Sequence, residues 1–274
     1  MPHRSEAPEP GALPGHVAIV GAGIVGVAAA LELARAGTPV SLVDREGPAA
    51  GASQGNGGVL AACAVVPVTV PGILRAAPRI LFDRDGPLFL RWSYLPRLAP
   101  WLARYLGHAN AADTARIARG LAPFVTDSLD AHQALAAGTP AERYVVPSDY
   151  LYLYRDRAAF DADAFGWGLR REAGFAWEEM ERDALSAYDP FLAQAAGFAV
   201  RMGGHGRISD PGAYVRALAA EAERLGARIV RAEVEDVVEQ GGRVAGLRLR
   251  TAAGAETLPC DAVVVTTGAW SGPL

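Results

Sequence analysis

The sequence predicts an α/β protein whose main domain is built on a parallel sheet, with an α+β domain inserted into it. Apolar runs typical of buried strands lie at 17–20 and 40–43 near the start and at 263–265 near the end. The region between them mixes helical and strand-like patterns and does not continue this alternation. We therefore expect a discontinuous domain formed by residues 15–60 and 203–274, and an inserted domain formed by residues 61–202.

Composition excludes several classes of protein. The chain has 274 residues, of which 51% are apolar and 20% charged, as expected for a globular protein with a sizeable core. Its net charge of −4 gives no reason to expect a nucleic-acid partner. Cys63 and Cys260 are too far apart for a disulfide framework or a metal site, so we expect buried free thiols in a cytoplasmic protein and no metal. Residues 1–14 are proline-rich, lack the pattern of a secretory signal and are predicted to form a mobile leader.

Residues 16–45 have the pattern of a βαβ unit that holds a dinucleotide. An apolar strand leads into three glycines, a helix of small residues and a second apolar strand. Gly21 permits a tight turn, Gly23 lets the backbone approach a pyrophosphate, and Gly26 lets the helix lie close on the strands. The helix N-terminus offers N–H groups and a positive dipole end to the phosphates. Asp44, placed 18 residues beyond Gly26, is suited to accept a ribose hydroxyl, so the domain is predicted to be Rossmann-like.

A membrane span is the alternative for this apolar stretch. Three glycines within six residues, together with Glu32 and Arg35, argue against a helix lying in hydrocarbon. We expect no transmembrane segment here.

The glycine-rich stretch 45–58 distinguishes the predicted site from a plain nicotinamide site. A nicotinamide domain normally passes from its second strand into another helix, whereas here a long polar loop follows Asp44. Its backbone N–H groups and the Ser53 hydroxyl could hold a second phosphate or the edge of a flavin ring. A flexible surface loop is the alternative interpretation.

Patterns along the remainder of the chain predict the other elements. Short amphipathic helices broken at Pro96 and Pro100 are expected in 88–106, and a helix divided at Pro123 is expected in 111–137. Further expected elements are strands at 144–146, 150–154 and 197–202, a helix at 160–173, a loop at 203–211, a helix at 214–225 begun by Asp210 and Pro211, strands at 228–232, 234–239 and 244–250, and a buried strand at 263–265.

Several of these segments together resemble the FAD-dependent D-amino-acid oxidase family. They are Gly21/Gly23/Gly26, Asp44-Arg45, the loop from Ser53 through Asn56-Gly57-Gly58, Asp210-Pro211, and the strand end from Asp261 to Thr267-Gly268-Ala269-Trp270. Within the family the chain is most similar to the small subunit of bacterial D-amino-acid dehydrogenase, with glycine and sarcosine oxidases as relatives. Such proteins continue for well over a hundred residues beyond the point matching Leu274. The resemblance therefore implies a substrate domain and a fold that are incomplete at the C-terminus.

The resemblance also implies that FAD is the cofactor. It places the pyrophosphate over Gly23 and the helix N-terminus, and the loop ending at Val59 beside the flavin ring. The cofactor-binding residues that it implies are Gly21, Gly23, Ile24, Val25, Gly26, Asp44, Arg45, Ser53, Asn56, Gly57, Gly58, Val59, Val234, Thr267 and Gly268.

The implied activity is oxidation of a D-amino acid or related amine by hydride transfer to flavin, giving an imino acid and then a keto acid. No catalytic residue is assigned. The electron acceptor is oxygen or a membrane quinone, and a quinone would bring the protein to a membrane surface. Two alternatives remain: a truncated remnant that binds FAD without catalysis, and an NAD-binding dehydrogenase.

Three residues are candidates for the substrate side. Tyr150 and Tyr152, with Tyr154, lie on one face of a predicted strand and could line a pocket over the flavin. His205 is the histidine beside the glycine-rich loop at 203–206. The alternatives are tyrosines that pack on neighbouring helices and a structural histidine.

Overall fold

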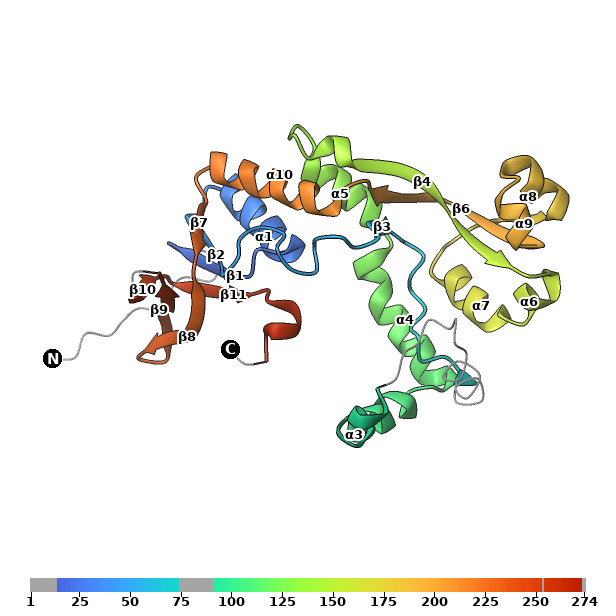
Figure 1. The fold of residues 1–274 in the computed structure, drawn as a ribbon, viewed down its shortest axis with the longest axis horizontal. Helices are drawn as coiled ribbons and strands as arrows, with labels where there is room; N and C mark the ends of the chain where they lie inside the picture. Colours follow the sequence, from blue (N-terminus) through green and yellow to red (C-terminus); the bar gives the residue numbers. More distant parts are fainter. Residues whose placement is uncertain (1–13, 74–90, 253, 273–274) are drawn as a thin grey trace. The chain divides into compact units, whose positions relative to one another are not determined.

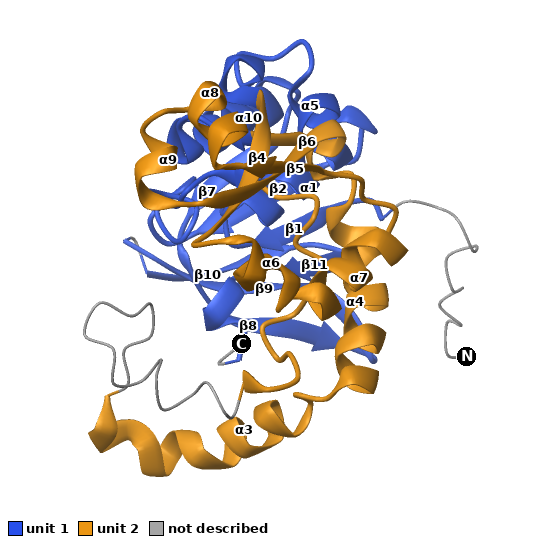
Figure 2. Ribbon diagram, turned by 90° about the vertical axis from the view of Figure 1, so that its right-hand side faces the viewer, with its two compact units in different colours: residues 1–59, 132–146, 207–274 blue, residues 60–131, 147–206 orange. Residues whose placement is uncertain are grey.

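The computed structural model describes residues 14–73, 91–252 and 254–272, and most of the predicted leader lies outside them. The chain forms two compact units. One consists of Met1–Val59, His132–Val146 and Arg207–Leu274, and the other of Leu60–Ala131 and Pro147–Gly206 (Figures 1 and 2). No helix of the described residues is long and apolar enough to cross a membrane.

The first unit contains the predicted parallel sheet. Its strand order is β11-β1-β2-β7, and every neighbouring pair is parallel. The strands are β1 (Val17–Val20), β2 (Val40–Asp44), β7 (Arg228–Arg231) and β11 (Ala262–Val265). All of β1 and most of β2 are buried, as the continuous apolar runs require. Helices α1 (Ile24–Arg35) and α10 (Pro211–Arg224) pack against each other (Figure 1), and the predicted strand–helix–strand unit is confirmed.

An antiparallel sheet completes this unit. Its order is β10-β9-β8, formed by β8 (Glu233–Gln240), β9 (Arg243–Thr251) and β10 (Gly254–Pro259). Gly241 and Gly242, both with positive φ angles, make the predicted turn between β8 and β9. Leucines of β9 and β10 share a buried cluster with Ala18, Val20 and Val43, so the two sheets pack on one core.

The second unit contains most of a further sheet, in which β6 is central and pairs antiparallel with β5. Its strands are β3 (Val59–Leu60), β4 (Val145–Tyr154), β5 (Glu178–Glu181) and β6 (Phe198–Ile208), of which Val59, Val145, Val146, Arg207 and Ile208 group with the first unit. Its helices are α3 (Leu95–Gly107), α4 (Ala111–Val125), α5 (Ser128–Ala136), α6 (Arg157–Asp161), α7 (Ala164–Glu172), α8 (Arg182–Tyr188) and α9 (Leu192–Ala195), α5 continuing into the first unit. Short 3-10 turns are η1 (Trp92–Tyr94), η2 (Glu142–Tyr144) in the first unit, and η3 (Gly268–Trp270), also in the first unit.

Three prolines do not break helices where the sequence predicted. Pro96 lies in the first turn of α3, where no intrahelical donor is needed, and Pro100 lies one turn later inside the same helix. The predicted division of 111–137 into two helices is confirmed, but α4 continues past Pro123 to Val125 and α5 begins at Ser128. A proline near a helix end removes a single hydrogen bond, and the remaining bonds of the helix outweigh that loss.

Two predictions about this sheet need correction. The strands predicted at 144–146 and 150–154 are confirmed except at Tyr144, which lies in η2, but they form the single strand β4. The glycine-rich segment 203–208 is not a loop but the second half of β6. The end of this half is paired, because the Ile208 N–H donates to the Gly58 carbonyl at 2.6 Å, and the chain turns locally at Gly204, where φ is +74°. The helical region 160–173 is likewise two helices, α6 and α7.

The division between units differs from the predicted domains at residues 132–146, which group with the first unit. Side chains explain this grouping. His132 Nδ1 lies 2.9 Å from the Tyr214 hydroxyl on α10, and Arg35 of α1 donates to the Leu135 carbonyl at 2.8 Å. Strand β11, predicted to be buried, is also partly exposed, with Val265 43% accessible, because among the described residues it pairs with β1 alone.

Replacing Gly26 by Ala is expected to lower the free energy of unfolding by about 3 kcal/mol, because overpacking against rigid backbone is costly. A Cβ at Gly26 would lie 1.9 Å from the Gly21 carbonyl oxygen. Gly120→Ala in α4 is the control, since its Cβ would meet nothing within 4 Å and should raise stability by about 0.5–1 kcal/mol. Urea unfolding followed by circular dichroism measures both, and equal effects would contradict the assignment.

Candidate functional site

A cleft of about 480 Å³ lies in the first unit at the carboxyl ends of β1, β2 and β11. This is the edge at which open α/β sheets bind ligands, and the volume is typical of a small-molecule site. The cleft brings together ten of the predicted cofactor residues: Gly21, Gly23, Ile24, Val25, Asp44, Arg45, Ser53, Val234, Thr267 and Gly268. The other five, Gly26, Asn56, Gly57, Gly58 and Val59, do not line it.

The glycine turn is shaped by contact with the end of β11. Gly21 has a φ of +101°, which favours glycine, and a Cβ there would lie 2.8 Å from the Thr266 carbonyl oxygen. The Thr266 hydroxyl reaches the carbonyl oxygens of Val20 and Gly21 at 2.8 and 2.9 Å. Sequence analysis missed Thr266 and selected its neighbour Thr267. The available signal was a threonine directly after a strand that pairs with the strand before the glycines.

Asp44 organises the turn after β2. Its Oδ1 accepts the N–H groups of Glu46 and Gly47, each at 2.8 Å, and its Oδ2 accepts the N–H of Ala22 at 2.9 Å. A carboxylate oxygen can accept about two hydrogen bonds. Oδ2 therefore retains acceptor capacity on the cleft side, where the sequence predicted a ribose hydroxyl.

Ser53 caps α1 from a distance in sequence. The N-cap residue, Gly23, has no side chain, and the Ser53 hydroxyl oxygen accepts the Ile24 N–H at 2.9 Å instead. Ser53 is 7% exposed, and its hydroxyl hydrogen is not used by this bond. The loop after Asp44 is thus fixed to the helix N-terminus at a polar point that lines the cleft.

Arg45 and Trp270 lie together at the same cleft. The Arg45 guanidinium lies 4.7 Å from the centre of the Trp270 ring, and its Nε lies 3.5 Å from a carboxylate oxygen of Glu46. Trp270, in η3, is largely exposed. The pair offers a cation and an apolar surface to the cleft that both residues line.

The loop 56–59 is ordered by its own hydrogen bonds. The Asn56 carbonyl oxygen Oδ1 accepts the Gly58 N–H at 2.9 Å, and Nδ2 donates to the Ala52 carbonyl at 3.1 Å. Gly58 has a φ of +62°, and a Cβ there would lie 2.2 Å from the Ile208 carbonyl oxygen. Asn56 and Gly58 therefore shape the loop, and their predicted place beside a flavin stays a prediction.

The cleft residues fit a dinucleotide. Three features line the cleft: the turn at Gly21, where a side chain would not fit, the N-terminus of α1, whose N-cap residue has no side chain, and the Asp44 carboxylate, which can accept a further hydrogen bond. The model of a family described as "FAD dependent oxidoreductase" matches residues 16–274 of the chain. The chain belongs to this family.

Two curated proteins resemble the chain in sequence. A protein of Bradyrhizobium diazoefficiens named D-amino-acid oxidase is 37% identical over 262 residues, which are 94% of this chain and 61% of that protein. A protein of Ralstonia nicotianae named D-amino acid dehydrogenase 2 is 33% identical over 269 residues, with the same coverage of both chains. The chain therefore spans about three fifths of the length of these relatives.

Solved structures share the fold of the chain. Glycine oxidase from Bacillus cereus superposes with a TM-score of 0.60 at 20% identity, over 94% of this chain and 56% of that one. Glycine oxidase from Geobacillus kaustophilus gives 0.60 at 23% identity, over 95% and 57%. The predicted mixed α/β class with a Rossmann-like parallel sheet is confirmed.

The predicted substrate-side residues Tyr150, Tyr152 and His205 lie in the second unit of this chain. His205 is 1% exposed, its Nδ1–H donates to the Gly203 carbonyl at 2.8 Å, and its Nε2 accepts the Cys63 N–H at 3.1 Å. Both ring nitrogens are therefore engaged with backbone, as in a structural histidine. Tyr150 and Tyr152 pack with Tyr154 against the buried cluster of Phe198, Val200 and Met202. Their role in substrate binding stays a prediction.

Arg170 is a buried arginine of the second unit that the sequence did not predict. Arg170 is 7% exposed. Its guanidinium lies 4.6 Å from the centre of the Tyr152 ring and 4.8 Å from that of Trp167, and it donates to the Tyr152 hydroxyl at 3.0 Å. Its Nε and Nη1 have no partner among the described residues. Burial raises the pKa of the Tyr152 phenol and of the Cys63 thiol, whose Sγ lies 3.6 Å from that phenol. A helical arginine near tryptophan gave too weak a pattern to detect.

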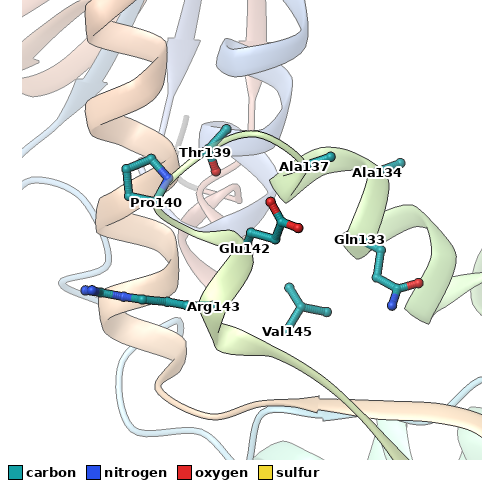
Figure 3. A pocket seen from close by; sticks show the side chains of 8 residues that line it. All are labelled: Gln133, Ala134, Ala137, Thr139, Pro140, Glu142, Arg143 and Val145. Carbon is teal, nitrogen blue, oxygen red and sulfur yellow. The ribbon is translucent and has the colours of Figure 1, made fainter.

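Another hollow, of about 920 Å³, is lined by Gln133, Ala134, Ala137, Thr139, Pro140, Glu142, Arg143 and Val145 (Figure 3). It is wide and open. Glu142 accepts the Gly138 N–H at 3.0 Å, and Arg143 donates to the hydroxyl of its neighbour Tyr144 at 2.6 Å. Its charged groups are thus already used locally, and the smaller cleft remains the candidate site. Within the described ranges no cluster of histidine, cysteine and carboxylate side chains could hold a metal ion.

Tyr152→Phe is expected to lower the free energy of unfolding by about 1–3 kcal/mol, because the buried guanidinium of Arg170 would lose its hydroxyl acceptor. Tyr188→Phe is the control. The Tyr188 hydroxyl also makes a hydrogen bond, to Asp149 at 3.1 Å, but the residue is exposed and the cost should stay below about 0.5 kcal/mol. Chemical denaturation measures the difference, and an unaffected Tyr152 variant would contradict this role.

Proposed function

We propose that this chain binds FAD in the cleft of its first unit and forms the cofactor-holding part of an oxidoreductase for D-amino acids or related amines. The substrate would be oxidised by hydride transfer to the flavin, giving an imino acid that water converts to a keto acid. The single observation that carries this proposal is the convergence of the glycine turn, the α1 N-terminus, Asp44 and Thr267-Gly268 on one cleft. The names of the two curated relatives support the choice of substrate class.

The chain's own residues would bind and orient the nucleotide. The turn at Gly21 and Gly23, with the α1 N-terminus and the Ser53 hydroxyl, would hold the pyrophosphate. Asp44 Oδ2 would accept an adenosine ribose hydroxyl, and the Val234 backbone would meet the adenine.

The remaining predicted residues would surround the other end of the cofactor. Thr267 and Gly268 would approach the second phosphate side, and the loop Asn56–Val59, fixed by the Asn56 side chain, would lie beside the ring. The flavin supplies the two-electron oxidation when bound, and the protein's share is binding, orientation and exclusion of water. Two buried free cysteines accord with a cytoplasmic protein.

Titration with FAD tests the proposal. Quenching of flavin fluorescence on addition of the purified chain, with no comparable response to NAD, is the expected result. If FAD binds, anaerobic bleaching of the flavin by D-alanine, D-proline, glycine or sarcosine then ranks the substrates. FAD binding without bleaching by any amine would instead identify a cofactor-binding chain that lacks the oxidation. Absence of FAD binding would overturn the proposal.

Asp44→Asn is expected to weaken FAD binding about 10- to 100-fold, because it replaces a charged acceptor and a hydrogen bond to a charged group contributes about 1.5–3 kcal/mol. Glu32→Gln is the matched control, since the Glu32 carboxylate is exposed, pairs with Arg35 at 2.8 Å and does not line the cleft. Dissociation constants come from the same fluorescence titration, after circular dichroism confirms that both variants are folded. An Asp44→Asn affinity within twofold of the parent would remove Asp44 from the ribose position.

A further inference from the structure

Helix α3, in the second unit, is amphipathic but has no buried residue. Its leucines and Tyr105 are half-buried, and they recur at helical intervals along one face: Leu95, Leu98, Leu102, Tyr105 and Leu106. Trp101 adjoins this face and is 57% exposed, with its ring stacked on that of Tyr105 at a centroid distance of 4.8 Å. An apolar stripe of this width normally faces a core, and here it faces partly into solvent.

The charges of this segment all have one sign. Arg97 and Arg104 are exposed and, at helical spacing, lie on the same side of the helix as Trp101, beside the face that carries the leucines. Arg91 is exposed just before η1. From residue 91 to residue 112 the sequence contains no aspartate or glutamate. Among the described residues none of these three arginines forms an ion pair, whereas Arg116 of α4 is paired with Asp113.

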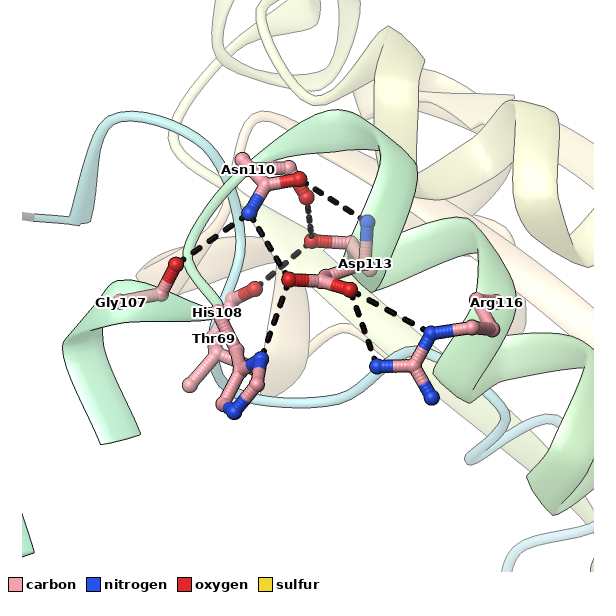
Figure 4. Close-up of polar contacts among 7 residues, drawn as sticks. Thr69, Gly107, His108, Asn110, Asp113 and Arg116 are labelled. Carbon is pink, nitrogen blue, oxygen red and sulfur yellow. Dashed lines mark hydrogen bonds and ion pairs between the residues drawn. The ribbon is translucent and has the colours of Figure 1, made fainter. Parts of the chain in front are cut away.

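Side-chain hydrogen bonds fix the junction between α3 and α4. Asn110 caps α4 by accepting the Asp113 N–H at 2.9 Å, and it also donates to the Gly107 carbonyl at the end of α3 at 3.3 Å (Figure 4). His108 Nδ1 lies 3.0 Å from the Asp113 carboxylate. The bonds from His108, Arg116 and Asn110 hold the pKa of Asp113 well below its usual range, so this junction keeps its charge. Helix α3 therefore leads into α4 through a hydrogen-bonded junction.

We propose that the segment from Arg91 to Gly107 binds the surface of an anionic lipid bilayer, with Leu98, Trp101, Leu102 and Tyr105 entering the headgroup region. Leucine and aromatic side chains on one face with arginines at its border match the pattern of an interfacial helix lying in the membrane plane. Tryptophan and tyrosine are suited to this depth because their rings are apolar and their edges polar. Arginine heads at the border of the face can reach anionic headgroups.

A second copy of the chain is a poorer occupant of this face. Two copies meeting through α3 by a twofold axis would bring six arginines together with no carboxylate from either segment to offset them. Nucleic acid is disfavoured by the net charge of −4 and by the leucines at the centre of the face. The inference is independent of the proposed oxidoreductase activity, since it involves no residue of the cofactor cleft.

Vesicle flotation with the full chain tests this proposal. The chain is expected to float with vesicles of phosphatidylcholine containing a third phosphatidylglycerol, and to float far less with phosphatidylcholine alone or in high salt. The Arg97→Gln/Arg104→Gln variant should bind about 30-fold more weakly, since each arginine near an anionic surface contributes about a factor of five. Trp101→Glu should abolish flotation.

Matched controls separate this surface from general charge and hydrophobicity. Arg119→Gln/Arg207→Gln removes two exposed arginines elsewhere, and Phe124→Glu changes an aromatic residue of α4 that is 81% exposed. Both controls should float like the parent, and circular dichroism should be unchanged in every variant because none of the replaced residues is buried. No flotation of the parent, flotation unaffected by Trp101→Glu, or a dimer in gel filtration that Trp101→Glu converts to a monomer would overturn the proposal. FAD titration of the same samples reports separately on the cofactor cleft.

Discussion

The close approach of three backbone segments at the end of β1 is the constraint on which the first unit depends. Gly26 lies so near the Gly21 carbonyl that no side chain fits between them. The Thr266 hydroxyl donates to the carbonyl oxygens of Val20 and Gly21. This contact joins α1, β1 and the end of β11, which come from opposite ends of the chain. Parallel strands cannot pair through a short hairpin, so the fold needs such a long-range contact to fix where the two ends meet.

The residues that shape this turn also line the cleft, so the same side chains stabilise the fold and form the site. Asp44 and Ser53 satisfy four backbone N–H groups between them, all within the loop and helix that surround the cleft. Buried donors must be paired in any case, so their acceptors are fixed in position whether or not a ligand is bound. A nucleotide would then meet groups that are already ordered, and less ordering would oppose its binding.

The sequence predicted the βαβ unit because each of its features has a local cause: glycines at fixed spacing, small residues on one helix face and an acid after the second strand. It did not predict Thr266, because that role depends on β11 pairing with β1 across more than two hundred residues. The helix breaks predicted at Pro100 and Pro123 do not occur at those residues, since whether a proline ends a helix depends on the packing and capping around it. The strand 203–208 was missed for a similar reason, because its end pairs through the Ile208 N–H with the Gly58 carbonyl, which lies far away in the sequence.

Strand β11 shows that the burial of an apolar strand depends on the strands beside it, which its own sequence does not specify. The run 262–265 is as apolar as β1, yet Val264 and Val265 are exposed whereas every residue of β1 is buried. The difference comes from position, since β1 lies between two strands and β11, within the described residues, has β1 on one side. An apolar strand at the edge of a sheet favours pairing with further strands, and Lys, Glu or Pro, which usually discourage such pairing, are missing from this one. The chemistry of β11 is therefore that of an interior strand, and its outer edge is suited to another parallel strand rather than to solvent.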